Sequence, residues 1–124
     1  MTRNKFVKDY TDLVKNVARL NNKCLKQGHS SLEGEVEDLN HENIKRGLYL
    51  IIDGADASII DEIYTNKISF VKDKYERQFL TIIKRSLLGI KKKEDTRFLY
   101  FALCSLANLS KDEQNTIDSI VLRD

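Results

Sequence analysis

The segment from Gly47 to Ile63 constrains the fold more than any other part of the chain. It contains a short apolar run that stops at Asp53-Gly54, and apolar residues return at helical spacing after Asp56. Gly54 suits the left-handed conformation that ends a helix, because a residue without a Cβ adopts it at no steric cost. Asp56 stands where an N-cap belongs, and its carboxylate can accept the free amide hydrogens of the next first turn. The segment therefore predicts a helix, a tight corner made by Asp53, Gly54 and Asp56, and a second helix.

Length and composition limit the chain to one domain of ordinary polarity. Its 124 residues are enough for one hydrophobic core and too few for two. The formal net charge of +2 is too small to indicate nucleic acid or an anionic membrane as a partner. No apolar run reaches the roughly 18 residues that a membrane helix needs. The sequence therefore predicts a soluble chain.

Apolar residues recur every three to four positions along most of the chain, which predicts an all-α fold. The expected helices cover residues 4–27, 31–39, 41–53, 57–88 and 96–108, and a last helix follows Ser110. No proline interrupts them. We expect a compact bundle of five to six helices joined by short capped turns. Helix 57–88 is its long helix unless it breaks near residues 72–78.

Residues with capping chemistry mark the expected helix ends. The expected caps are Gly28 and Gly89 at helix ends, Asn40 and Asp95 at helix starts, and capping boxes at Ser30 with Glu33 and at Ser110 with Glu113. The helix at 96–108 is apolar nearly all round. Such a helix either lies centrally or covers a self-association surface.

No pattern of residues indicates catalysis, a metal or a cofactor. His29 and His41 have no cysteine or carboxylate at metal-ligand spacing on a shared helix face, and we interpret them as turn and first-turn residues. Cys24 and Cys104 lie in apolar helical patterns, which predicts reduced thiols. No phosphate-binding loop and no nucleophile with a nearby base can be named. We therefore predict a protein that is not an enzyme and binds neither metal nor cofactor.

Three stretches resemble the MotA-type family of flagellar motor stator proteins. Residues 27–37, Gln-Gly-His-Ser-Ser-Leu-Glu-Gly-Glu-Val-Glu, resemble the G-x-x-x-L-E segment of that family's cytoplasmic loop. Residues 44–56 resemble its GL-x-L-x-x-DG-x-D signature, and residues 87–106 resemble its C-terminal cytoplasmic tail. On this resemblance, residues 1–76 correspond to the loop and residues 77–124 to the tail, within one helical domain.

The two membrane helices that separate loop and tail in the family are absent from this sequence. The chain is either an engineered soluble form from which the membrane hairpin was deleted or a natural soluble relative. We favour the deletion, because Met1 precedes a segment that in the family continues from a membrane helix. Ala57 and Thr96 stand where the family usually has proline, and Leu25 stands where it has a cation.

The resemblance implies a cytoplasmic domain that transmits force from ion flow to the rotor. MotA-type proteins form a ring around an ion-channel partner subunit in the bacterial inner membrane, and their cytoplasmic loop pushes on the rotor switch protein through complementary charge. The matching position for the acidic contact is Glu33, with Arg19, Lys23 and Lys26 as the cationic side. These three cations recur at spacings of four and three, so they can share one helix face.

A second hypothesis does not depend on the resemblance to the MotA-type family. The chain could be a small helical adaptor or regulatory protein that binds a partner helix or dimerises through residues 98–109. The apolar character of that segment is its only support in the sequence.

Overall fold

The computed structural model describes residues 1–122, and this part of the chain is helical throughout with no strand. The elements are α1 (Arg3–Gln27), the 3₁₀-helices η1 (His29–Leu32) and η2 (Val36–Asp38), α2 (Glu42–Ile52), α3 (Ala57–Ser69), α4 (Lys74–Lys91), α5 (Thr96–Ala107) and α6 (Lys111–Val121). The predicted all-α bundle of five to six helices is confirmed. The long helix is α1, with 25 residues, and not the segment 57–88.

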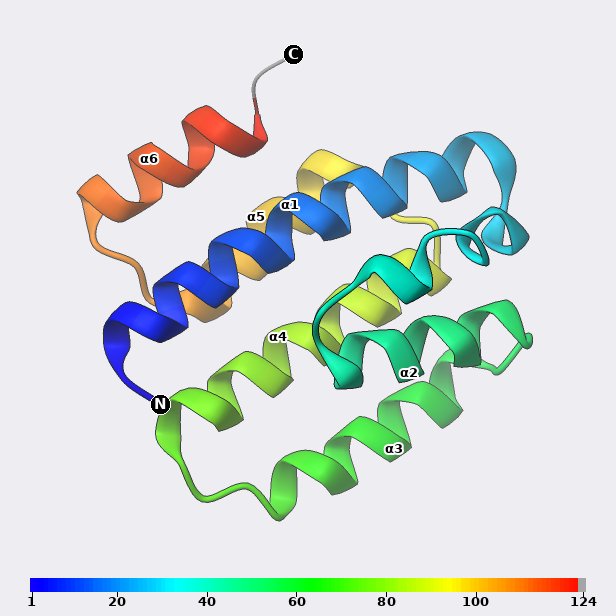
Figure 1. Ribbon diagram of the computed structural model, residues 1–124, viewed down its shortest axis with the longest axis horizontal. Coiled ribbons are helices and arrows are strands. Elements are labelled where there is room, and N and C mark those ends of the chain that lie inside the picture. Colours follow the sequence, from blue (N-terminus) through cyan, green and yellow to red (C-terminus); the bar gives the residue numbers. More distant parts are fainter. Residues whose placement is uncertain (123–124) are drawn as a thin grey trace.

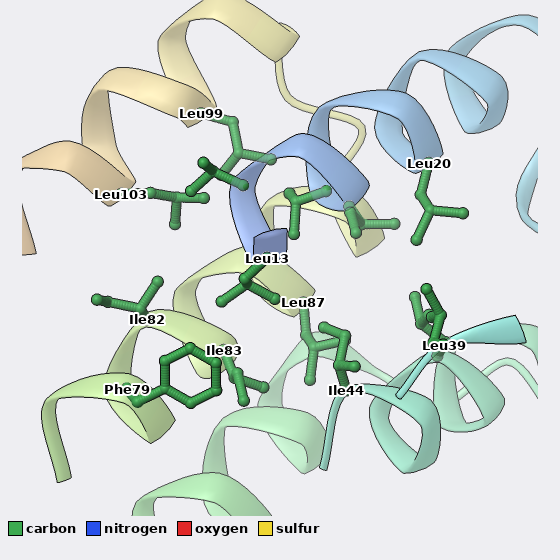
Figure 2. Packing of buried hydrophobic residues seen from close by; sticks show 14 of the residues in the cluster. Leu13, Leu20, Leu39, Ile44, Phe79, Ile82, Ile83, Leu87, Leu99 and Leu103 are labelled. Carbon is green, nitrogen blue, oxygen red and sulfur yellow. The ribbon is translucent and has the colours of Figure 1, made fainter. Parts of the chain in front are cut away.

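Helix α4 lies at the centre of the bundle. Helices α1 and α5 pack on one side of it and α2 and α3 on the other, while α6 lies along the outer side of α1 (Figure 1). Apolar side chains of α1, α2, α4 and α5 meet between these layers (Figure 2). Leu13 of α1, Ile44 of α2, Ile83 and Leu87 of α4, and Leu103 of α5 are all buried there. Burial of such side chains from water is the main force that holds the layers together.

The apolar stripe over residues 57–88 belongs to two helices. The chain turns at residues 70–73, and α3 and α4 then pack against each other in opposite directions (Figure 1). The Asp73 carboxylate accepts a hydrogen bond of 2.9 Å from the Glu76 amide and caps α4. The break that the sequence allowed is therefore present. The uninterrupted apolar stripe in the sequence is compatible with this break, because two helices that pack on the same core both bury residues at helical spacing.

The predicted corner between α2 and α3 is confirmed. Gly54 has a φ of 85°, and its amide donates to the Ile51 carbonyl at 3.0 Å. The Ala55 amide donates to the Leu50 carbonyl at 2.9 Å, which completes a Schellman motif. Asp56 is the N-cap of α3, but its side chain makes no capping hydrogen bond, so that expectation is wrong. The exposed carboxylate acts through its charge at the helix N-terminus, where water solvates it.

The segment between α1 and α2 is not the predicted α-helix. Residues 29–38 form two short 3₁₀-helices, and the capping box of Ser30 with Glu33 is absent. The Ser31 hydroxyl instead donates to the Gly28 carbonyl at 2.6 Å. Gly34 in the middle of the segment disfavours an α-helix by about 1 kcal/mol relative to alanine. At the start of α2, the N-cap is His41 rather than Asn40.

The caps of the last two helices are confirmed. The Asp95 carboxylate accepts a hydrogen bond from the Phe98 amide and starts α5. Both bonds of the capping box between Ser110 and Glu113 are present at the start of α6. Helix α5 is not central, because Leu99 and Leu103 are buried while Phe98 is exposed.

Gly89 is not the end of its helix. It lies inside α4, where a Cβ would come within 2.4 Å of Leu99 Cδ1, so glycine allows α4 and α5 to approach closely. The helix ends at Lys91, and Lys93 takes the left-handed conformation with a φ of 56°. The Lys93 amide donates to the Ile90 carbonyl at 3.1 Å. A lysine therefore occupies the position that glycine usually takes after a helix.

We expect Lys93→Gly to raise the free energy of unfolding by about 1 kcal/mol, because the left-handed conformation costs a residue with a Cβ roughly that much. Denaturant unfolding followed by circular dichroism measures the change. Lys92→Gly is the matched control, since Lys92 has a φ of −85° and gains nothing from glycine. Equal effects of the two substitutions would contradict the assignment of strain to Lys93.

Candidate partner-binding surface

Two of the predicted cations share one acidic partner. Arg19 Nη1 lies 2.9 Å and Lys23 Nζ 3.4 Å from the same Glu35 oxygen, so α1 is tied to the segment between η1 and η2. The Arg19 guanidinium, with help from the Lys23 ammonium, holds the pKa of the Glu35 carboxyl below its ordinary value. The spacing argument that placed Arg19 and Lys23 on one face of α1 is consistent with this geometry. The contact with Glu35 was not predicted, because nothing local in the sequence connects residue 35 to residues 19 and 23.

The other two residues predicted to contact a partner, Glu33 and Lys26, are not held in ion pairs as Arg19 and Lys23 are. Both are exposed, and neither forms an ion pair within residues 1–122. Lys26 lies in the last turn of α1, where a cation is favourable beside the negative end of the helix dipole. Of the four charges singled out from the sequence, these two remain fully available to a partner.

The acidic residues around the α2–α3 corner have structural roles. Asp53 is the C-cap of α2, and both Asp53 and Asp56 are exposed. Further along α3, an Asp61 oxygen lies 2.6 Å from Lys84 Nζ and links α3 to α4. The hydrogen bond from Lys84 lowers the pKa of Asp61. The corner therefore sets the angle between two helices and supplies no cluster of converging carboxylates.

The histidines contribute to packing and capping. His29 Nε2 lies 2.9 Å from the Ile90 carbonyl oxygen. His41 Nδ1 accepts a hydrogen bond from the Asn43 amide, and its ring lies 5.0 Å from that of Phe79. Burial lowers the pKa of His41. Within residues 1–122 no group of three His, Cys, Asp or Glu side chains could hold a metal ion.

A groove of about 350 Å³ runs between α1 and residues 39–44. Its floor is apolar, and an ion pair of 3.0 Å between Lys5 and Asp9 lies along its rim. His41 is the one histidine among its lining residues, and that ring already caps α2. The groove holds no nucleophile placed beside a base.

A polar seam attaches α6 to α1 and α5. The Tyr100 hydroxyl donates to Asp118 at 2.6 Å, and Gln114 Nε2 donates to the same carboxylate at 2.7 Å. The Cys104 thiol accepts from Gln114 Nε2 at 3.2 Å and from the Tyr10 hydroxyl at 3.4 Å. Burial, reinforced by the Asp118 hydrogen bond, raises the pKa of Tyr100. Each polar group of the seam has a partner inside the bundle, as expected of a structural contact.

Comparisons with known proteins add no assignment, since no protein family, curated protein or solved structure matches the chain. Within residues 1–122, the helices are all too short or too polar to span a bilayer. The protein is thus a helical bundle with two exposed charges, Lys26 and Glu33, in or next to its 3₁₀ segment, and neither forms an ion pair within residues 1–122.

Proposed function

We propose that this chain is a force-transmitting helical domain of a flagellar motor stator subunit, which acts on the rotor switch protein through surface charge. The observation that carries the proposal is the position of Glu33. It occupies the glutamate position of the G-x-x-x-L-E segment, it is exposed, and it forms no ion pair within residues 1–122. It directly follows η1, which packs against α1. On this proposal the domain works at the cytoplasmic side of the bacterial inner membrane, beside an ion-channel partner subunit and further copies of itself.

The packing of the matched segments supports the same proposal. The segment of residues 27–37 contacts α2, and α2 leads directly into the corner at Gly54. Two of the stretches that resemble the family therefore pack against each other, with the charged segment mounted on α2. A contact surface that transmits force needs such a mounting, because a loose segment would yield before the partner moved.

The energetics of exposed charges suit a moving partner. An exposed ion pair contributes about 1 kcal/mol or less, so no single contact locks two surfaces together. Several such pairs still steer and orient an approaching partner. The proposed role is therefore mechanical and non-catalytic.

We expect Glu33→Lys, introduced into the chromosomal gene, to remove most swimming in soft agar. The substitution would place a cation where the partner presents one, and like charges in direct contact cost several kcal/mol. Because Glu33 is exposed and unpaired, the thermal unfolding of the isolated domain should stay unchanged. Glu62→Lys is the matched control, since Glu62 is also exposed and lies on α3, away from the cationic face.

Normal swimming with Glu33→Lys would reject the role of Glu33. An equal loss with Glu62→Lys would also reject it, because the effect would then follow net charge and not position.

A second candidate function rests on the outer face of α5. Phe98 is 73% exposed and Phe101 45% exposed, whereas Leu99 and Leu103 on the opposite face are buried. Exposed aromatic side chains of this size favour an adaptor that associates through α5. Sedimentation equilibrium tests self-association through α5, because a strictly monomeric chain would exclude it.

A further inference from the structure

Helix α6 is attached to the rest of the bundle mainly through polar contacts. Ile117 is its one fully buried side chain. Arg3 Nη2 of α1 donates to Glu113 Oε1 at 2.7 Å and to the Asn108 carbonyl at 3.1 Å. The polar seam joins the next turns of α6 to α5. We call the surface that α6 covers the α6 groove and define it by the residues that bind α6, namely Arg3, Tyr100 and Cys104.

The end of α6 is packed loosely. A cleft of about 500 Å³ is lined by Val121 and Leu122 of this end and by Asn22 and Arg97 of α1 and α5. Ile120 is 37% exposed. An element with few buried apolar contacts opens at a lower cost than the core of a domain. Helix α6 is therefore held in its groove by a few specific pairs and not by deep burial.

The turn between α5 and α6 consists of Asn108, Leu109 and Ser110. Asn108 has a left-handed backbone, with a φ of 50° and a ψ of 54°, and its amide makes no capping hydrogen bond within residues 1–122. Asparagine tolerates this conformation, but it is unfavourable for a residue with a Cβ. Neither glycine nor proline occurs from Thr96 to Val121, so the residue types permit one continuous helix.

The buried faces of α5 and α6 are in phase across this turn. Buried and half-buried positions of both helices, with the N-cap serine between them, follow one another at steps of three or four residues. They are Leu99, Leu103, Ala107, Ser110, Gln114, Ile117 and Val121. If α5, the turn and α6 formed a single helix, both buried faces would therefore lie on the same side of it.

We propose that α6 exchanges between two copies of this chain, so that the α6 helix of each copy occupies the α6 groove of the other. In the exchanged dimer, residues 96–121 form one helix of roughly 39 Å, which carries α6 away from its own groove. Every contact that holds α6 in the monomer forms again, because the second copy supplies the same side chains. This inference does not depend on the proposed function.

The pattern of the groove favours a second copy over an unrelated helix. An occupant must present a carboxylate to Arg3, and an amide and a second carboxylate to Cys104 and Tyr100. Helix α6 has these groups in the required order. The capping box of Ser110 forms only in the closed turn, so it favours the monomer, and exchange increases with protein concentration.

The ion pair between Arg3 and Glu113 provides the first test. One variant carries Arg3→Glu and the other carries Glu113→Arg, so like charges meet when either variant is alone. In an exchanged heterodimer, the groove of each variant receives a helix of opposite charge. We expect the equimolar mixture to dimerise at least about tenfold more tightly than either variant alone. Sedimentation equilibrium up to about 0.5 mM measures this difference. The control is the single chain Arg3→Glu/Glu113→Arg, which restores the pair internally and should dimerise no more than the parent chain.

The turn provides the second test. Asn108→Ala/Ser110→Ala removes the residue that tolerates the left-handed conformation and the side chain that caps α6, so the continuous helix is favoured. Asn108→Gly is the matched control, because glycine adopts the left-handed conformation freely and favours the closed turn. We expect the first variant to dimerise at least about tenfold more tightly than the second.

A mixture of the two charge variants that contains no more dimer than each variant alone would overturn the proposal. Equal dimerisation of Asn108→Ala/Ser110→Ala and Asn108→Gly would also overturn it, since association would then use another surface, such as the exposed face of α5. The turn variants leave the α6 groove unchanged, so they decide the question even where a charge variant loses helical signal in circular dichroism. Neither test needs a motor, and both are independent of the swimming assay.

Discussion

Gly47→Ala is expected to lower the free energy of unfolding by about 1–3 kcal/mol, as overpacking of a close-packed core does. A Cβ at Gly47 would lie 2.1 Å from Leu87 Cδ1 and 2.7 Å from Leu87 Cδ2. Leu87 is fully buried between α2 and α4, so it has little room to move away. Urea unfolding measures the loss. Gly34→Ala is the control, because a Cβ at Gly34 would meet nothing within 4 Å.

A double-mutant cycle ties this effect to one contact. Leu87→Ala alone should cost about 2–5 kcal/mol, since it empties a buried site. In Gly47→Ala/Leu87→Ala the new methyl group occupies part of that site. The double variant should therefore lose less stability than the sum of the two single variants. Strict additivity would show that Gly47 matters for a reason other than its approach to Leu87.

Asn21→Asp is expected to lower the free energy of unfolding by about 3–5 kcal/mol at neutral pH, the cost of an unpaired buried charge. The Asn21 amide is fully buried and donates to the Glu94 carbonyl and the Thr96 hydroxyl. An aspartate of the same shape would turn that donor into a charged acceptor that faces a carbonyl oxygen. Urea unfolding at pH 7 measures the change.

The pH dependence of Asn21→Asp follows from linkage. A buried, unpaired carboxyl has a raised pKa in the folded state, so the folded state holds its proton at a pH where the unfolded state has lost it. The protonated group can also donate to the Glu94 carbonyl. The stability deficit should therefore shrink as the pH falls from neutral toward the ordinary pKa of aspartate, about 4.

Asn22→Asp is the matched control for this variant. Asn22 is exposed, and its oxygen accepts from the Thr96 hydroxyl at 2.6 Å, a bond that a carboxylate can also accept. We expect a change within about 0.5 kcal/mol. A deficit for Asn21→Asp that is equally small, or that does not change with pH, would contradict the buried geometry of Asn21.

The local features of the fold were readable in the sequence. The all-α class, the corner at Gly54 and the cap at Asp95 all appear where residue type and spacing predict them. Each depends on hydrogen bonds or steric limits that act within a few residues of the chain. A short window of sequence contains all the atoms involved.

Errors arose where two local signals competed or a distant residue decided the outcome. Ser30 and Glu33 have the chemistry of a capping box, but Gly34 and the packing of Leu32 favour 3₁₀ turns. Gly89 has the chemistry of a helix end, but its contact with Leu99 keeps it inside α4. At Gly89 the tertiary contact outweighs a propensity difference of about 1 kcal/mol or less.

The sequence by itself determined the all-α class, the corner at Gly54 and the caps of the last two helices. Only the tertiary structure decided that Glu35 holds Arg19 and Lys23, and that Asn21 of α1 binds the Glu94 carbonyl in the turn after α4. These contacts join residues from 12 to 73 positions apart. Charge and periodicity constrain what a residue can contact, but the helix packing that buries the apolar faces selects which distant partner it meets.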